Sequence, residues 1–483
     1  MYMSRLKTSM AVVAFMGLLS ACSDNADEFL NTDSRMAKNL SSNVSREIVS
    51  HTFTFDVPAE TKNADFVDCK AILTNVETQK KDTISVFTKK GNQYTGELSI
   101  QEGTYNIEMQ GKVKYIIDVN NYKKKLPKAM IKKNIREVEA MVKTDMPPIN
   151  IQKGGDKNTN VRLKVRNRHE GLLISEIFYA HTTDPEGHIY VDDTYMKIAN
   201  NSDTVIYADG LAFVETFFTS DDKHDYQPDI MSQAMTINTI YVIPGSGKEH
   251  PIQPGKEITI ALTAEDHTKH NPNSIDLSKA DFEICDQSSV QSGGDKDMPN
   301  VPNMLNWYPG FEGTFAFHDR GVKSYAIVSP VSMNQHNMKN FRYHFQYHYS
   351  FNGFETDMKE FEFFMPNAWV VDCVNLSVVG GNQQWLCASE TLDKGYAHCG
   401  VTDFDDGRYN HSVVRKREGH NYVEEDANIK GAPVESEWWI DQNLSLGGKW
   451  IDTNNSSEDF VSNSCPTFMQ MKLKKTGIRR IHM

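Results

Sequence analysis

Residues 341–351 read FRYHFQYHYSF, in which every odd-numbered position is aromatic and every even-numbered position is polar. Strict alternation has the period of a β-strand, so the aromatic side chains share one face and both histidines share the other. His344 and His348 then stand roughly 13 Å apart, at about 3.3 Å per residue, whereas two imidazoles on one zinc ion each lie about 2 Å from it. We expect the aromatic face to enter a core. The opposite face carries Arg342, His344, Gln346 and His348 and is a candidate surface for a ligand or a partner. We do not expect a metal site there.

The rest of the chain also has β-strand patterns, which predicts an all-β protein. Residues 49–150 contain the short runs HTFTFDV, CKAILTNV, DTISVFTK and YNIEMQGKVKYIIDV, separated by polar and glycine-containing turns. One short helix is predicted over residues 132–142. The sequence MPP followed by KGGDKNTN predicts a domain boundary close to residue 150.

Two stretches resemble known β-domains. ELSIQEGTYNIEMQG resembles the closing part of a transthyretin-like or carboxypeptidase-regulatory-like domain, which implies an Ig/transthyretin-like β-sandwich at 49–150. RHEGLLISEIFYA, DDTYMKIANNSDTVIYADGLAFVETFF and IYVIPGSGKEHPIQPGKEITIALTAEDH resemble a lamin-tail-like β-sandwich at 151–290. Residues 291–483 are predicted to be a β-rich region that is either a separate domain or the completion of the preceding sandwich.

Longer motifs carry a family resemblance. AEDHTKHNPNSIDLSKADFE, FEFFMPNAWVVDCV, SVVRKREG and WIDTNNSSEDF are similar to a Bacteroidota lipoprotein family known only as domain of unknown function 4876. The resemblance runs from about Ile151 to Phe460. It implies no catalytic residues, because none are established for that family.

The N-terminus has the pattern of a lipoprotein signal peptide. Arg5 and Lys7 are basic, an apolar run follows, and the sequence LSAC ends at Cys22. The apolar run of about 10 to 12 residues is shorter than the roughly 20 that a membrane-spanning helix needs. We expect residues 1–21 to be removed and acyl chains on Cys22 to anchor the protein in the outer membrane. The alternative is a plain secretory signal with an incidental cysteine.

Acidic residues follow the lipidated cysteine directly. The residues Ser23, Asp24, Asp27 and Glu28 resemble the surface-export signal of Bacteroidota lipoproteins. This resemblance implies that the protein is exposed at the cell surface. Residues 22–48 are predicted to be a flexible tether, since they are rich in Ser, Asn and Asp. The competing interpretation is a solvated tether whose acidic bias arose by chance.

Charge and cysteine content limit the classes of function. The chain has a formal net charge of −13, which becomes −15 when Arg5 and Lys7 leave with the signal peptide. Nucleic acid would repel such a chain, so nucleic-acid binding is not expected. Six cysteines remain after lipidation, and in an exported protein they permit disulfides in 15 pairings that the sequence cannot rank: Cys69, Cys285, Cys373, Cys387, Cys399 and Cys465.

No sequence motif establishes an enzyme. PGSGKEH differs from a phosphate-binding loop, because Glu249 follows Lys248 and Val242 stands where a glycine is required. The motifs G-x-S-x-G and H-E-x-x-H do not occur in the sequence. A glycosidase pair of carboxylates is defined by its spatial separation and cannot be read from a sequence.

Three histidine, cysteine or aspartate patterns are weak metal candidates. Asp403, Asp405 and Asp406 precede Gly407 out of register for an EF-hand, which favours a surface turn over structural calcium. His267 and His270 are expected to be surface histidines with satisfied hydrogen bonds. A third cluster has too few ligands at the usual spacing for zinc: Cys387, His398 and Cys399.

Taken together, these features predict a non-catalytic lipoprotein exposed on the outer membrane, without a cofactor. Lipidated β-sandwich proteins often accompany outer-membrane transporters. By association, the resemblance therefore implies an accessory role beside a TonB-dependent transporter. In that role the protein would bind the transporter, a nutrient, or both. One alternative is a surface hydrolase that acts on glycan or peptide. A further alternative is a lipoprotein that captures haem or metal.

Overall fold

The computed structural model describes residues 46–61, 63–118, 135–284, 296–310, 314–380, 382–400, 406–427 and 436–476. The predicted signal peptide, the lipidation site Cys22 and the export-signal residues Ser23, Asp24, Asp27 and Glu28 lie outside these ranges. Cys285 also lies outside them, as do two aspartates of the candidate calcium turn, Asp403 and Asp405.

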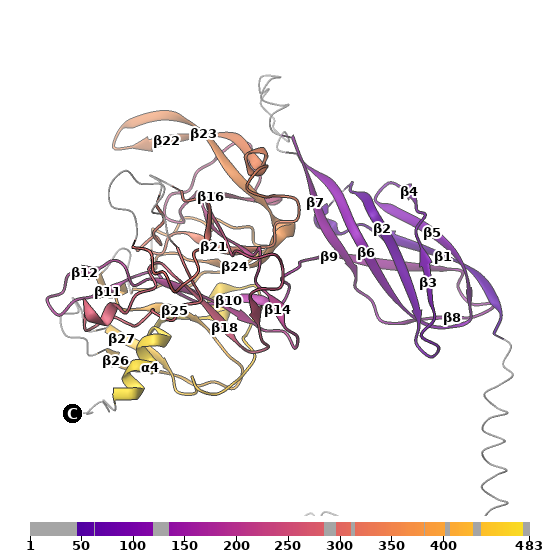
Figure 1. Cartoon of the computed structure of the whole chain (residues 1–483). Coiled ribbons are helices and arrows are strands. Elements are labelled where there is room, and N and C mark those ends of the chain that lie inside the picture. The colour runs from indigo at the N-terminus through magenta and orange to yellow at the C-terminus, as the bar shows by residue number, and fades with distance from the viewer. Residues whose placement is uncertain are drawn as a thin grey trace, which may run out of the picture.

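The described chain is almost entirely β-structure, which confirms the predicted all-β class (Figure 1). Its first unit is one long sheet with the strand order β3-β2-β6-β7-β9-β1-β5-β4, with β8 paired to β6. The strands are β1 (Ile48–Asp56), β2 (Asp65–Asn75), β3 (Lys81–Ile84), β4 (Thr88–Lys90), β5 (Gln93–Gln101), β6 (Gly103–Asp118), β7 (Ile135–Thr144), β8 (Ile149–Ile151) and β9 (Asn158–Arg166).

This first sheet folds over onto itself. Phe53 and Phe55 alternate along β1 and are fully buried. At Gly96 in β5, an added Cβ would lie 2.5 Å from Cγ2 of Ile84 in β3. Because β3 and β5 lie near opposite ends of the strand order, this close approach shows that the two ends of the sheet pack face to face around the core.

The helix predicted over residues 132–142 is wrong within the described part of that range. Residues 135–144 form β7, which pairs antiparallel with β6. Val138, Ala140 and Val142 are buried at alternate positions, so the apolar period is 2 and not 3.6. The neighbouring Glu137, Glu139 and Lys143 are residue types that favour helices, but pairing with β6 and β9 overrides that preference.

The first sheet also extends beyond residue 150, where a boundary was predicted. β9 pairs in parallel with β1 and antiparallel with β7. The stretch KGGDKNTN therefore connects β8 to β9 within this sheet, and the chain leaves the sheet after Arg166. Gly154, with φ of +80°, takes up the left-handed backbone of that connection.

The second unit is a sandwich of two sheets. One sheet has the order β19-β18-β13-β10-β25-β28-β27-β26, and the other has the order β22-β23-β16-β15-β21-β24, with β20 paired to β16. Both sheets contain strands from before and from after residue 290, so the C-terminal region completes the preceding sandwich.

The strands of the first of these sheets are β10 (Leu172–Phe178), β13 (Tyr195–Asn200), β18 (Glu257–Ala261), β19 (Phe282–Glu283), β25 (Ser412–Arg415), β26 (Tyr422–Ala427), β27 (Ser436–Asp441) and β28 (Phe460–Ser464). Those of the second are β15 (Ala212–Thr216), β16 (Ala234–Val242), β20 (Leu305–Tyr308), β21 (Ser324–Val328), β22 (Arg342–Phe351), β23 (Phe354–Pro366) and β24 (Val370–Asn375).

Short elements complete the second unit. Two small ribbons pair β11 (Thr182–Thr183) with β12 (Ile189–Tyr190) and β14 (Ile206–Tyr207) with β17 (Pro251–Ile252). In the part of the chain that the structure describes, the α-helices are α3 (Ser456–Asp459) and α4 (Thr467–Thr476). Single 3₁₀ turns include η1 (Ala59–Thr61), η2 (His267–Lys269), η4 (Met338–Phe341), η5 (Asn367–Trp369) and η6 (Asp406–Arg408). Within the described residues, none of the helices has the length and apolar content to cross a membrane.

The two units are joined by buried contacts as well as by the chain. Trp369 of η5 is fully buried and belongs to a hydrophobic cluster that includes core residues of the first sheet. Its indole N–H donates to the backbone carbonyl oxygen of Glu139 in β7 at 2.5 Å. Asn167 donates from Nδ2 to the carbonyl oxygen of Val370 at 2.8 Å. The first sheet is therefore docked against one end of the sandwich.

Candidate functional site

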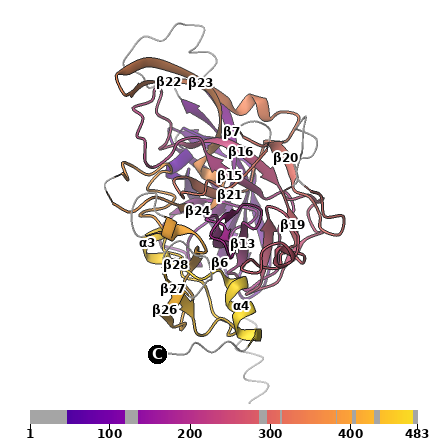
Figure 2. The same cartoon turned by 90° about the vertical axis from the view of Figure 1, so that its left-hand side faces the viewer.

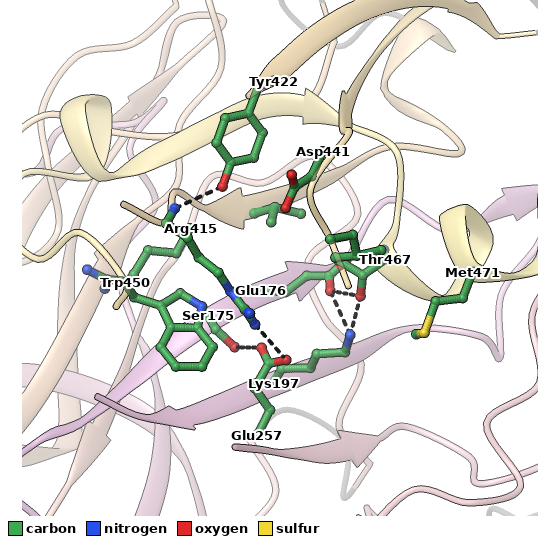
Figure 3. A pocket seen from close by; sticks show the side chains of 13 residues that line it. Ser175, Glu176, Lys197, Glu257, Arg415, Tyr422, Asp441, Trp450, Thr467 and Met471 are labelled. Atoms are coloured by element: carbon green, nitrogen blue, oxygen red, sulfur yellow. Dashed lines mark hydrogen bonds and ion pairs between the residues drawn. The ribbon is translucent and has the colours of Figure 1, made fainter. Parts of the chain in front are cut away.

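A small polar cavity of about 110 Å³ lies inside the second unit (Figure 3). That space suits a few water molecules or a small polar molecule. Charged side chains from β10, β13, β18, β25, β27 and the segment after β25 line it: Glu176, Lys197, Glu257, Arg415, Arg417 and Asp441.

A buried ion pair forms the floor of the cavity. Glu176 in β10 lies directly opposite Lys197 in β13, and Lys197 Nζ is 3.2 Å from Glu176 Oε2. Tyr195 donates its hydroxyl to Glu176 Oε1 at 2.7 Å, and the backbone N–H of Thr467 donates to the same oxygen at 2.9 Å. Lys197 also donates to the Thr467 hydroxyl. A buried carboxylate needs such partners, because desolvation without them is costly.

Arg415 forms the second charged cluster, at the seam of the two sheets. Its guanidinium lies 2.7 Å from Asp372 and 3.3 Å from each of Asp452 and Asp459. Its Nε donates to the carbonyl oxygen of Ile174 at 2.8 Å. Burial raises the pKa of Asp372 to about 6, although the adjacent guanidinium acts to lower it. Burial therefore destabilises the ionised carboxylate of Asp372, and the guanidinium of Arg415 offsets part of that desolvation cost.

The remaining lining groups are paired in the same way. Arg417 lies 3.3 Å from Glu257 and stacks over the Trp450 ring at 4.1 Å. Ser175 donates its hydroxyl to Glu257 Oε1 at 2.5 Å. Asp441 Oδ2 lies 2.7 Å from Nδ1 of His420 (not itself a lining residue). The charged groups that line the cavity thus have partners in the chain.

The sequence did not point to this cavity as a site. The signal that was available is the presence of single charged residues within otherwise apolar strands: Glu176 in LLISEIF, Lys197 in YMKIAN and Arg415 in SVVR. Charged residues are rarely buried unless they are paired, so each predicts a partner. The partner itself cannot be read locally, since Arg415 and Ile174 are 241 residues apart.

The second candidate site is the hairpin formed by β22 and β23. It stands clear of the sandwich at the end opposite α4 (Figures 1 and 2). Phe345 packs against Phe217 and Phe218 in the body of the unit. Farther out, Phe351 and Phe354 flank the two-residue turn and are 61% and 63% exposed. The expectation that the whole aromatic face enters the core is therefore wrong for the outer part of the strand, because the strand extends past the body that covers it.

A two-residue Asn-Gly turn closes the hairpin. Asn352 and Gly353 have φ of +49° and +81°. Positive φ at both central residues matches a type I′ turn, whose twist suits a tight hairpin. The predicted strand over FRYHFQYHYSF is confirmed from Arg342 to Phe351.

The predicted polar face of β22 is indeed opposite the aromatic one. Arg342 stacks over the Phe361 ring at 4.2 Å, and the His344 ring stacks on Phe361, also at 4.2 Å. Gln346 is exposed, and His348 Nδ1 lies 3.1 Å from Asp357 Oδ1 across the hairpin. The two histidines therefore have separate partners.

The PGSGKEH loop is organised around a carboxylate instead of a phosphate. Asp209 accepts hydrogen bonds from the backbone N–H groups of Gly247, Glu249 and His250 at 2.9 to 3.0 Å. Although burial acts to raise it, these N–H groups hold the pKa of Asp209 below its usual value. Asp209, Glu249 and His250 are the single group of potential metal ligands found among the described residues, with ligand atoms within 4.8 Å of one another. Since Asp209 already accepts three bonds, a structural role accounts for the group.

The other metal candidates have ordinary environments. His267, expected at the surface, is fully buried, with Nδ1 3.0 Å from the Tyr190 hydroxyl and Nε2 2.9 Å from the Thr263 carbonyl oxygen. His270 Nε2 lies 3.2 Å from Glu265. The five described cysteines are free thiols, and no disulfide occurs among them: Cys69, Cys373, Cys387, Cys399 and Cys465.

Comparison with known proteins supports the family resemblance seen in the motifs. A family model described as "Protein of unknown function (DUF4876)" matches residues 253–467. A similar solved structure is the 2.50 Å crystal structure of a DUF4876 family protein from Bacteroides thetaiotaomicron, with 19% identity, a TM-score of 0.44, and coverage of 86% of this chain and 96% of that chain. No curated protein matches the chain. Residues 253–467 of the chain are thus similar to the DUF4876 family of proteins of unknown function.

Proposed function

We propose that this chain is a non-catalytic binding protein, anchored by lipid on Cys22 at the surface of the outer membrane, and that it is an accessory component of TonB-dependent nutrient uptake. The observation that carries the proposal is the β22–β23 hairpin, whose tip leaves Phe351 and Phe354 uncovered. Aromatic side chains grouped on an exposed surface are typical of protein interaction sites.

The charged cavity favours binding over catalysis. Its acids and bases are engaged with one another, for example Glu176 with Lys197 and Arg417 with Glu257. A general base must be within hydrogen-bond reach of a substrate proton, and these groups are instead within reach of their own partners. The cavity can hold water or a small polar molecule without supplying a reactive group.

The experiment is a recovery of membrane complexes through the full-length lipoprotein. Detergent-solubilised outer membranes are passed over affinity-tagged protein, and recovered proteins are identified by mass spectrometry. We expect an outer-membrane barrel with the native chain and much less of it with the double variant Phe351→Ser and Phe354→Ser. Leu446→Ser is the matched control, because Leu446 is 55% exposed on another part of the unit. Recovery of no barrel with the native chain would contradict the uptake role.

The competing classes make different predictions in the same preparation. Turnover of labelled glycans or peptides, abolished by one carboxylate substitution, would identify a surface hydrolase. A Soret shift, or metal bound in stoichiometric amounts, would identify haem or metal capture.

A further inference from the structure

We propose that the hairpin recognises its partner by strand addition: an extended, basic segment of the partner pairs with the open edge of β22. The inference rests on the binding role proposed above, and it specifies the chemistry of the partner. Strand addition uses main-chain hydrogen bonds for affinity and alternate side chains for specificity.

The edge of β22 is open beyond Gln346. β22 is the first strand of its sheet, with β23 on one side only. On the other side, Gln346 exchanges backbone hydrogen bonds with Gln227 at 2.8 and 3.0 Å, as an isolated bridge. Because backbone groups alternate in direction along an antiparallel strand, those of His348 and Ser350 point to the same side as those of Gln346. No described backbone segment pairs with these two residues on that side.

The side chains around this edge select a partner by charge. The outer part of the hairpin, residues 347–358, contains Glu355 and Asp357 but no Lys or Arg. Both carboxylates are exposed on the face that also carries His348. The other face offers Tyr349 and Phe351 as apolar contacts. An incoming strand with basic side chains on one face and apolar side chains on the other would complement both faces.

Two other occupants fit less well. In a second copy, the outer part of β22 offers no Lys or Arg to the carboxylates, and pairing two tips through His348 and Ser350 involves too few residues to approach the roughly 1,200 Å² of a specific interface. An anionic lipid surface would be repelled by Glu355 and Asp357 beside the exposed aromatic tip.

The test uses the detergent-solubilised mature lipoprotein and two labelled nonapeptides, one of alternating lysine and valine and one of alternating glutamate and valine, with binding followed by fluorescence anisotropy. We expect the basic peptide to bind at least about tenfold more tightly than the acidic one. Reversing the tip charges with Glu355→Lys and Asp357→Lys should weaken its binding at least about tenfold. Glu97→Lys is the matched control, since Glu97 is exposed in β5 of the first unit.

A second variant tests the backbone part of the proposal. Ser350→Pro removes an N–H that points to the open edge, and proline is tolerated at such edge positions. We expect it to weaken binding of the basic peptide while circular dichroism and the melting temperature stay unchanged. Native binding by Ser350→Pro, or by the charge-reversed variant, would overturn strand addition. If the native protein forms a dimer that Ser350→Pro disrupts, the occupant of the edge is a second copy and the proposal is wrong. If the protein binds anionic vesicles through Phe351, the occupant is a lipid surface and the proposal is likewise wrong.

The two proposals fail in different ways. If no basic peptide binds while recovery of a barrel still depends on Phe351 and Phe354, strand addition is wrong and the accessory role stands. If the basic peptide binds at the hairpin edge and no barrel is recovered, the uptake role is wrong and the recognition chemistry stands.

Discussion

Arg415 and Asp372 form a buried ion pair across the seam of the sandwich, with Arg415 Nη2 2.7 Å from Asp372 Oδ2. Arg415 ends β25 in one sheet and Asp372 lies in β24 of the other. The same carboxylate oxygen accepts the backbone N–H of Ile174 at 2.7 Å. One side-chain pair therefore connects the two sheets and a third strand, β10.

Loss of this pair should be strongly destabilising. Arg415→Ala leaves the buried carboxylates of Asp372 and Asp459 without their cation, and breaking a buried pair costs about 3 to 5 kcal/mol. Urea unfolding followed by tryptophan fluorescence measures the free energy of unfolding. Lys449→Ala is the control, because its exposed pair with Asp203 should contribute less than about 1 kcal/mol. Equal losses in the two variants would contradict the structural role of Arg415.

The pH dependence of stability should report a buried acid beside this seam. Burial raises the pKa of Asp393 to about 7, although its bond from the Ser456 hydroxyl acts to lower it. The folded protein then holds a proton on Asp393 that the unfolded chain releases near pH 4, so the contribution of this group to stability is greatest below pH 4 and is lost as pH rises towards 7. Asp393→Asn should remove that part of the fall, which is on the order of 3 kcal/mol. The free energy of unfolding of the native protein and of Asp393→Asn is measured at pH 4, 5.5 and 7. The same dependence on pH in both proteins would contradict the prediction.

Buried thiols should be unreactive in the folded protein. Burial raises the pKa of Cys387 and of Cys399 to about 12, and that of Cys69 to about 11. The thiolate is the reactive form, so iodoacetamide at pH 8 should label the buried thiols of Cys387 and Cys399 only after unfolding. Peptide mass mapping of native and urea-treated samples measures the labelling of each cysteine. Rapid native labelling at Cys387 or Cys399 would contradict the burial of these side chains.

Much of the fold could be predicted from the sequence, because alternation along a strand is a local pattern. Little of the candidate site could be predicted, because it depends on contacts between distant residues. Alternation is local, so the strand at Arg342–Phe351 was predicted correctly. The exposure of Phe351 depends on where the body of the sandwich ends, which no local pattern records. β7 was mistaken for a helix because Glu and Lys hid a period of 2. The charged cavity depends on pairs such as Glu176 with Thr467, which are 291 residues apart.

The short helix α4 was missed for a related reason. Its ten residues, TFMQMKLKKT, follow Pro466 and contain several residues that favour helices. Contacts with distant segments anchor it: Met469 and Gln470 are buried, Gln470 Oε1 accepts the backbone N–H of Asp441 at 3.2 Å, and Lys472 donates to the carbonyl oxygen of Pro272 at 2.6 Å. A helix this short is stabilised by such tertiary contacts and not by its own sequence.

The final prediction separates a structural from a metal-binding role for Asp209. Asp209→Ala removes the acceptor for three partly buried backbone N–H groups of the 247–250 loop, and each hydrogen bond to a charged group contributes about 1.5 to 3 kcal/mol. We expect a clear fall in the melting temperature of the variant and faster hydrogen exchange at the amides of Gly247, Glu249 and His250. His250→Ala is the matched control, because it keeps the carboxylate and its three bonds while removing one potential metal ligand. Zinc or calcium should leave the melting temperature of the native protein unchanged. If either ion instead raises that temperature, and His250→Ala abolishes the increase, Asp209 serves a metal site and the loop-anchoring account is wrong.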